Sequence, residues 1–246
     1  MAGLSSTVEP ESRIRSEPIA PRSRRAVFAD RIHAGEQLAN NLGEYSRDRT
    51  AVVLSVSRGG AIIGSVVAET LGIPHYYYMV KAIPWPQMPR LSLGSVAGDG
   101  SARIDNAIAQ SVGIAQEELL RIVKEADQGL LREQAAFHLD VPGRDELDGR
   151  TLVVVDDGCE AGDTMREAIM HLRHCHSECR IVVAVPVCLA DLKRQLQRHA
   201  SVVDIVSPVF TGSVARWYAG GATPVERERR KLEQMFEGDI GQFDID

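Results

Sequence analysis

The chain lacks the features that mark membrane, secreted and nucleic-acid-coating proteins. No apolar run in its 246 residues approaches the roughly 18 residues that a membrane-spanning helix needs. The first 30 residues have no apolar centre of the kind found in a secretory signal. The formal net charge of −6 argues against a broad nucleic-acid-binding surface. We therefore expect a cytoplasmic protein that contacts neither a membrane nor nucleic acid.

Cysteine is also scarce, and its spacing is not that of a secreted disulfide framework. The four cysteines are Cys159, Cys175, Cys179 and Cys188. We expect them to be reduced thiols. On a continuous helix, His171, Cys175 and Cys179 would fall at i, i+4 and i+8, with His174 and His176 nearby, and would gather metal ligands. A helix end followed by a turn explains the same residues and is the favoured interpretation.

The composition that is present suits one soluble domain, with 44% hydrophobic and 25% charged residues. Residues 1–25 are the exception, because five arginines, three prolines and few large apolar side chains cannot bury much surface. We predict a disordered tail over 1–25 and a single domain over 26–240. An arm that docks on a partner subunit is an alternative for the tail. An organelle transit peptide is another, and the acidic residues Glu9, Glu11 and Glu17 oppose it.

Short β-branched runs alternate with helical patterns along the domain, which is typical of a doubly wound α/β fold. The predicted strands are 51–56, 76–80, 91–96, 151–155, 181–186 and 202–206. Predicted helices end near Gly72 and His174 and cover parts of 106–138, 189–199 and 226–236. This order predicts a largely parallel sheet with helices on both faces. The proline-rich segment 81–89 is predicted to be a functional loop in a small hood region.

The most informative stretch is a buried strand that ends in two acids and a glycine-rich turn. Strand 151–155 is followed by Asp156 and Asp157, and Gly158 and Gly162 allow the backbone to turn tightly and approach a ligand. Residues 156–164 are called the acidic loop below. An ordinary surface turn after a central strand is the alternative explanation for the acid pair alone.

A helix start directly after the acidic loop favours an anion site. Thr164 is predicted to cap this helix, with Glu167 at the spacing of a capping box. The unpaired N–H groups of a first helical turn attract anions such as phosphate. Cys159 lies inside the loop, where nearby carboxylates oppose thiolate formation, so we treat it as a loop residue rather than a nucleophile.

Two other segments are predicted to reach the same edge of the sheet, where α/β folds bind ligands. The turn after the first strand holds Ser57, Arg58, Gly59 and Gly60. Arg58 offers a forked donor to phosphate, and the two glycines let backbone N–H groups approach closely. Lys81 follows the next strand and supplies a mobile positive charge. Singly, Arg58 and Lys81 read as surface charges, but as a set these segments indicate a functional site.

At the acidic loop the chain resembles the type I phosphoribosyltransferases, whose signature is an apolar strand, two acids, a loop ending Thr-Gly-x-Thr and a helix. The wider resemblance, to stand-alone bacterial members of unassigned substrate, is carried by residues 28–31, 57–60, 81, 93–96, 156–164, 183–187 and 217–218. Ala161 replaces the first threonine, and Glu160 and Asp163 replace small neutral residues. A carboxylate about 5 Å from a phosphate, at an effective dielectric near 20, repels it by roughly 3 kcal/mol. The loop is therefore a degenerate version of the family motif.

The resemblance implies transfer of ribose 5-phosphate from phosphoribosyl diphosphate to a nitrogen nucleophile, with Mg²⁺ as cofactor. Asp156 and Asp157 would serve catalysis and the metal, and Arg58 and Lys81 would stabilise the leaving diphosphate. The implied substrate-binding residues are Gly59, Gly60, Gly158, Cys159, Glu160, Ala161, Gly162, Asp163 and Thr164. A homodimer is the default for the family. The acceptor would lie under the hood near Trp85 or Tyr218, and core packing is the alternative role for either aromatic.

Two alternatives follow from the altered loop. A non-catalytic descendant would sense nucleotides or phosphate and would have lost the transfer reaction. An altered enzyme would use Glu160 and Asp163 to face a cationic substrate or a second metal.

Overall fold

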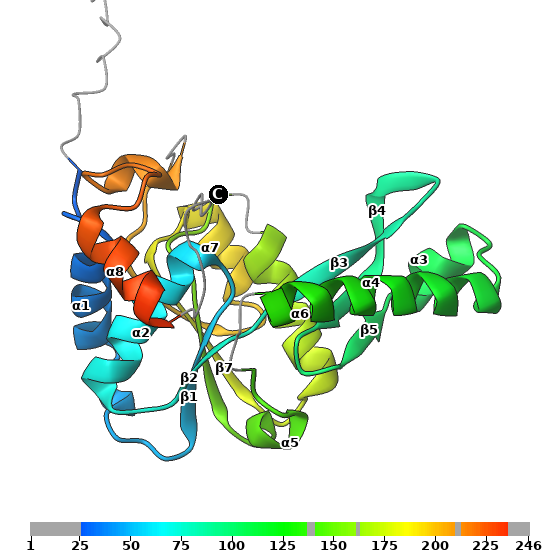
Figure 1. The fold of residues 1–246 in the computed structure, drawn as a ribbon, viewed down its shortest axis with the longest axis horizontal. Helices are drawn as coiled ribbons and strands as arrows, with labels where there is room; N and C mark the ends of the chain where they lie inside the picture. The colour runs from blue at the N-terminus through cyan, green and yellow to red at the C-terminus, as the bar shows by residue number, and fades with distance from the viewer. Residues whose placement is uncertain (1–25, 137–140, 161–162, 210–212, 236–246) are drawn as a thin grey trace, which may run out of the picture.

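The computed structural model describes residues 26–136, 141–160, 163–209 and 213–235 (Figure 1). The predicted tail over 1–25 lies outside the described residues, as do Ala161 and Gly162 of the acidic loop. No helix within the described ranges is both long enough and apolar enough to cross a membrane.

A five-stranded parallel sheet forms the centre of the protein, in the order β2-β1-β6-β7-β8. Its strands are β1 (Ala51–Ser55), β2 (His75–Tyr77), β6 (Thr151–Val155), β7 (Arg180–Val187) and β8 (Ser201–Val206). Strands β1, β6 and β7 are almost wholly buried, as expected for β-branched runs that are covered on both faces. The carboxyl ends of all five strands meet at one edge of the sheet.

Helices cover both faces of this sheet, which confirms the predicted α/β fold class. On one face α1 (Arg31–Asn41) and α2 (Arg58–Leu71) bury Leu38 and Ile63 against the strands. Helix α8 (Glu226–Met235) packs on α2 through Leu232. The other face is covered by α6 (Asp163–Cys175) and α7 (Ala190–Leu196). Figure 1 shows α1, α2 and α8 together on one side of the sheet.

The hood is a second, antiparallel sheet that projects away from the parallel one (Figure 1). It consists of β3 (Val80–Trp85), β4 (Met88–Ala97) and β5 (Ala102–Ile104), with α3 (Asn106–Ser111) and α4 (Gln116–Ala136) packed on it. The predicted loop over 81–89 is therefore wrong, because most of it is the β3–β4 hairpin. Pro84 fits in β3 because it sits on an edge strand at a register irregularity, where a missing N–H donor is tolerated.

Shorter elements join these layers. They are the 3₁₀ helices η1 (Gly43–Tyr45) and η2 (Val214–Trp217) and the short helix α5 (Arg144–Leu147). The strand predicted over 76–80 is divided between β2 and β3. The helix predicted over 189–199 ends at Leu196, and residues 197–200 connect α7 to β8.

Candidate active site

Two of the three predicted segments meet directly at the carboxyl edge of β1 and β6. These neighbouring strands pair in parallel, with Ser55 opposite Val155. Ser57 then caps α2, because its Oγ accepts the N–H of Gly60 at 2.9 Å. The same hydroxyl donates to Oδ1 of Asp156, which also accepts the N–H of Asp157 at 2.9 Å. The first turn of α2 is thus bonded to the acid pair.

The two glycines of α2 are required by the close approach of this helix to β6. A Cβ atom on Gly59 would lie 2.3 Å from Oδ2 of Asp157 and 3.1 Å from Nε of Arg31. A Cβ atom on Gly60 would lie 2.8 Å from the carbonyl oxygen of Val155. Because Gly59 and Gly60 have no side chains, α2 can pack closely against the end of β6. This packing requirement holds whether or not a ligand is bound.

Replacing Gly59 with alanine is expected to destabilise the protein by about 1–3 kcal/mol, because the added methyl group overpacks the site and displaces the Asp157 carboxylate. Gly129 is the matched control, since it also lies within a helix and has open space around its Cβ position. There the same substitution is expected to stabilise by up to about 1 kcal/mol through helix propensity. Urea unfolding of both variants measures the difference, and similar changes in both would contradict the packing argument.

Arg31 is a site residue that the sequence-based list lacks. It is the first residue of α1, behind the cap Asp30, and is only 2% exposed. Its Nε donates to Oδ2 of Asp157 at 2.8 Å, and its Nη1 lies 3.8 Å from Oε1 of Glu228. Its guanidinium also stacks 4.7 Å from the ring centroid of Tyr218. Asp157 is 126 positions away, so no local pattern reveals this partner. The only indication in the sequence was that Arg31 belongs to residues 28–31, one of the segments that carry the resemblance to the phosphoribosyltransferases.

Burial sets the protonation behaviour of the acid pair. It raises the pKa of Asp156 to about 7, and the neighbouring charge of Asp157 adds to the rise, against the hydrogen bond from Ser57. Burial also raises the pKa of Asp157, against the opposing effect of Arg31. The site therefore holds two desolvated carboxylates beside one buried cation.

Segment 213–218 closes over the acid pair and the start of the acidic loop. Tyr218 donates its hydroxyl proton to the carbonyl oxygen of Asp157 at 2.5 Å. A Cβ atom on Gly158 would lie 2.6 Å from Cγ2 of Val214, so this glycine is needed for the contact. Glu160 accepts a hydrogen bond from the N–H of Val214, the first residue of η2. The Glu160 carboxylate is thus engaged by a backbone donor on this segment.

Cys159 turns toward the core rather than toward solvent. It is buried, its N–H donates to the carbonyl oxygen of Val187 at 2.9 Å, and its own carbonyl accepts from Leu189 at 3.3 Å. A hydrogen bond with Cys188 and burial raise the pKa of its thiol. The expectation that Cys159 is no nucleophile agrees with this environment, and its backbone N–H is already bonded within the protein.

The remaining predicted residues take the following places. Helix α6 begins at Asp163, so Thr164 lies inside its first turn and the prediction that Thr164 caps the helix is wrong. Glu167 pairs with Arg103 of the hood at 2.5 Å instead of completing a capping box. Arg58 is the first residue of α2, and Lys81 lies on β3 opposite Val96. Both interact with other residues of the chain.

The two aromatic residues that were predicted to lie near the acceptor, Tyr218 and Trp85, differ in their surroundings. Tyr218 is buried at the site, with Arg31 over its ring. Trp85 is partly buried against the core of the antiparallel sheet, which agrees with a packing role for that residue.

Comparisons with known proteins agree with this architecture. Residues 99–218 match the family model "Phosphoribosyl transferase domain". Two curated proteins from Mycobacterium tuberculosis, of strains CDC 1551 / Oshkosh and H37Rv and both named "Putative phosphoribosyl transferase", are 29% identical over 195 residues, or 78% of this chain. The chain spans 43% of the length of these relatives. The crystal structure of TT1426 from Thermus thermophilus is 28% identical with a TM-score of 0.65, covering 84% of this chain and 98% of that one. The chain is therefore similar in sequence to phosphoribosyl transferases over most of its length, and it shares the fold of TT1426.

Proposed function

We propose that the protein binds phosphoribosyl diphosphate together with Mg²⁺ and transfers ribose 5-phosphate to a nitrogen nucleophile. The observation that carries this proposal is the direct bonding of the Ser57–Gly60 turn to Asp156 at the carboxyl edge of two neighbouring parallel strands. The match of residues 99–218 to the phosphoribosyl transferase domain model makes a phosphoribosyl compound the expected ligand of this edge. The proposal includes a cytoplasmic location, a part in nucleotide metabolism and a homodimer.

The charges of the site suit a reaction in which positive charge develops on the sugar. Carbon 1 of the ribose becomes cationic as the diphosphate leaves, so the Asp156 and Asp157 carboxylates would stabilise it and hold the ribose hydroxyls. Arg31 keeps Asp157 in place through its 2.8 Å bond. Arg58, at the start of α2, and Lys81 would neutralise the leaving diphosphate. The first turn of α6, with Asp163 and Thr164, would meet the 5-phosphate.

The donor set fits Mg²⁺ shared with the substrate better than Mg²⁺ held by the protein alone. Mg²⁺ prefers oxygen ligands and is usually held by one or two carboxylates plus substrate phosphates. Asp156 and Asp157 supply two carboxylates. The bond from Ser57 uses Oδ1 of Asp156, and the bond from Arg31 uses Oδ2 of Asp157. A Mg²⁺ ion there would supply charge stabilisation for the leaving diphosphate.

Calorimetric titration with phosphoribosyl diphosphate and Mg²⁺ tests the proposal. Ligand at 100 times its dissociation constant is expected to stabilise the folded protein by about 2.7 kcal/mol, visible as a rise in melting temperature. Ribose without phosphate is the control ligand and is expected to give no shift. Absence of heat and of any thermal shift at millimolar phosphoribosyl diphosphate would refute the proposal.

One observation favours a second candidate, a non-catalytic sensor of nucleotides or phosphate. Glu160, within the acidic loop, keeps its carboxylate and bonds it to the N–H of Val214, so the loop carries negative charge where the family motif is neutral. In that case, the affinity for phosphoribosyl diphosphate would rise greatly in a variant with the family motif restored, which combines Ala161→Thr, Glu160→Ala and Asp163→Ala. Unchanged or weaker binding would show that the native loop is already adapted to its ligand.

A further inference from the structure

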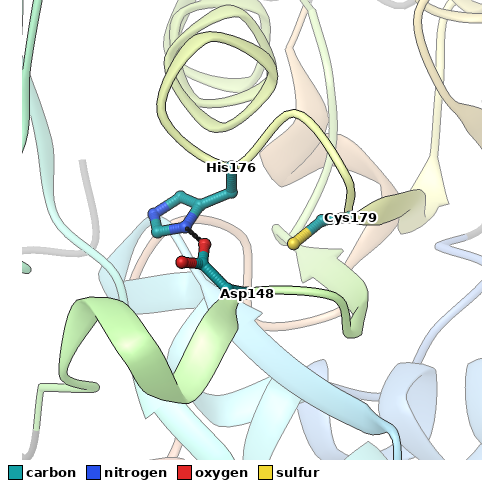
Figure 2. A group of neighbouring side chains, drawn as sticks. All are labelled: Asp148, His176 and Cys179. Carbon is teal, nitrogen blue, oxygen red and sulfur yellow. Dashed lines mark hydrogen bonds and ion pairs between the residues drawn. The ribbon is translucent and has the colours of Figure 1, made fainter.

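A second group of chemistry-bearing side chains lies at the opposite edge of the parallel sheet. Asp148 precedes β6, and His176 and Cys179 precede β7, so all three stand at the amino ends of these strands. Figure 2 shows the imidazole of His176 facing the carboxylate of Asp148, with the thiol of Cys179 beside them. Their ligand atoms all lie within 4.8 Å of one another. Within 26–136, 141–160, 163–209 and 213–235, this is the one group of three such residues with that spacing.

This group differs from the helical set His171, Cys175 and Cys179 that the sequence suggested. Helix α6 ends at Cys175, so Cys179 leaves the helical face and pairs with other elements. The ring of His171 is bonded to the hydroxyls of Ser95 and Ser101 at 2.9 and 2.7 Å. The partners of Cys179 come from the turn after α6 and from the end of α5.

His176 is oriented as a metal-binding histidine usually is. Its Nε2 is bonded to Oδ2 of Asp99 at 2.8 Å, and the side chains of both residues are fully buried. Asp99 is itself held by the N–H of Ser101 at 3.0 Å. A carboxylate on one ring nitrogen fixes the tautomer and directs the other nitrogen to the metal. That other nitrogen, Nδ1, lies 2.6 Å from Oδ1 of Asp148.

We propose that Asp148, His176 and Cys179 form a zinc-binding site, with Asp99 as the positioning residue behind His176 and water as the fourth ligand. Imidazole nitrogen, thiolate sulfur and carboxylate oxygen are the three ligand types of Zn²⁺, and three protein ligands plus water give its usual tetrahedral coordination. The Asp148 side chain is 55% exposed, which provides an entry path for the ion.

Small movements convert the present arrangement into a coordination sphere. A tetrahedral zinc ion with bonds of about 2.0–2.3 Å separates its ligand atoms by about 3.3–3.7 Å. The Asp148 oxygen must therefore retreat from Nδ1, which its exposed position beyond α5 allows. The Cys179 thiol, which now donates to the carbonyl oxygen of Leu147 at 2.9 Å, must turn toward the ion.

The charges balance once the ion is bound. Zn²⁺ takes the place of the proton between Nδ1 and Asp148, and the thiol proton of Cys179 also leaves to solvent. The ion then carries two positive charges against one carboxylate and one thiolate, with a neutral imidazole. Asp99 keeps its hydrogen bond to Nε2–H. Such an ion would link the end of α5 to the turn before β7. It would stabilise the edge of the sheet at the amino ends of β6 and β7, opposite the acidic loop.

Cobalt substitution of the full-length protein tests the site directly. After treatment with a chelator, addition of Co²⁺ is expected to give one equivalent of bound metal with visible ligand-field absorption and a thiolate-to-cobalt charge-transfer band. Zn²⁺ is expected to displace the Co²⁺ and to raise the melting temperature. Asp99→Asn is expected to weaken metal affinity by about 10–100-fold while leaving the charge-transfer band in place.

Matched variants decide which residues bind. Cys179→Ser is expected to remove the charge-transfer band, and Asp148→Asn, at an exposed position, is expected to weaken binding without unfolding the protein. Cys175→Ser and His174→Gln, on the neighbouring helix end, are the controls and should leave the spectrum unchanged. Absence of stoichiometric binding, or a band that survives Cys179→Ser, would overturn the proposal. Since Mg²⁺ gives no thiolate band, this result is independent of phosphoribosyl diphosphate binding.

Discussion

Replacing Arg31 with methionine is expected to lower the free energy of unfolding by about 3–5 kcal/mol, as is typical when one partner of a buried ion pair is removed. Methionine fills a similar volume without charge, so Asp157 keeps its burial and loses the cation 2.8 Å away. Glu228 is less affected, because it accepts the backbone N–H groups of Arg31 at 2.6 Å and Val225 at 2.8 Å. The uncompensated charge on Asp157 is therefore the main source of the loss.

The loss of unfolding free energy in Arg31→Met is expected to become smaller as the pH falls. Arg31 opposes the rise in the pKa of Asp157, so its removal raises that pKa further above the value in the unfolded chain. An acid whose folded pKa is raised destabilises the protein above the unfolded pKa and ceases to do so once both states are protonated. The loss is thus expected to be largest near neutral pH and to shrink as the pH falls toward about 4.

Urea unfolding at two pH values measures the effect, and Arg121→Met is the matched control. Arg121 makes an exposed i,i+4 pair with Glu125 on α4, so its replacement is expected to change stability by no more than about 0.5 kcal/mol. An equal, small change in both variants would show that the Arg31–Asp157 pair contributes nothing to folding.

Local patterns in the sequence were sufficient for the parallel sheet and for the position of the acid pair. Strands such as 151–155 are buried on both faces, so they read as continuous β-branched runs that end where polar residues begin. The adjacency of β1 and β6 then brings Ser57 and Asp156 together, and parallel pairing alone predicts a shared edge. Single-residue boundaries were less accurate, as the start of α6 at Asp163 shows.

Features that depend on tertiary context could not be found this way. The prolines of segment 81–89 are typical of a loop. Pro84 nevertheless lies on an edge strand, where the lack of a backbone N–H donor is tolerated. Arg31 gains its role from Asp157 and Glu228, far along the chain. Only the assembled protein shows that Glu160 is bonded to Val214 of segment 213–218.

For the transfer reaction that we propose, Asp157→Asn is expected to reduce kcat/KM by about a hundredfold, mainly through kcat. A carboxylate about 5 Å from the cationic carbon, at an effective dielectric near 20, contributes roughly 3 kcal/mol of attraction. That charge develops only in the transition state, so losing the attraction slows the reaction more than it weakens substrate binding. The amide oxygen can still accept the bond from Arg31, so the accompanying loss of stability is expected to be only about 1–3 kcal/mol.

Asp204→Asn separates the chemical role of Asp157 from general destabilisation. Asp204 lies on β8, two strands from β6, and its largely buried carboxylate pairs with Lys193 at 2.7 Å. The same substitution there removes the charge of another acid from an ion pair, so a comparable loss of stability is expected with kcat within about twofold of the native value. Rates are compared at a temperature where both variants are folded. If Asp204→Asn slowed transfer as much as Asp157→Asn, or if Asp157→Asn kept native activity, the acid pair would be a structural feature of the sheet edge and not part of the chemistry.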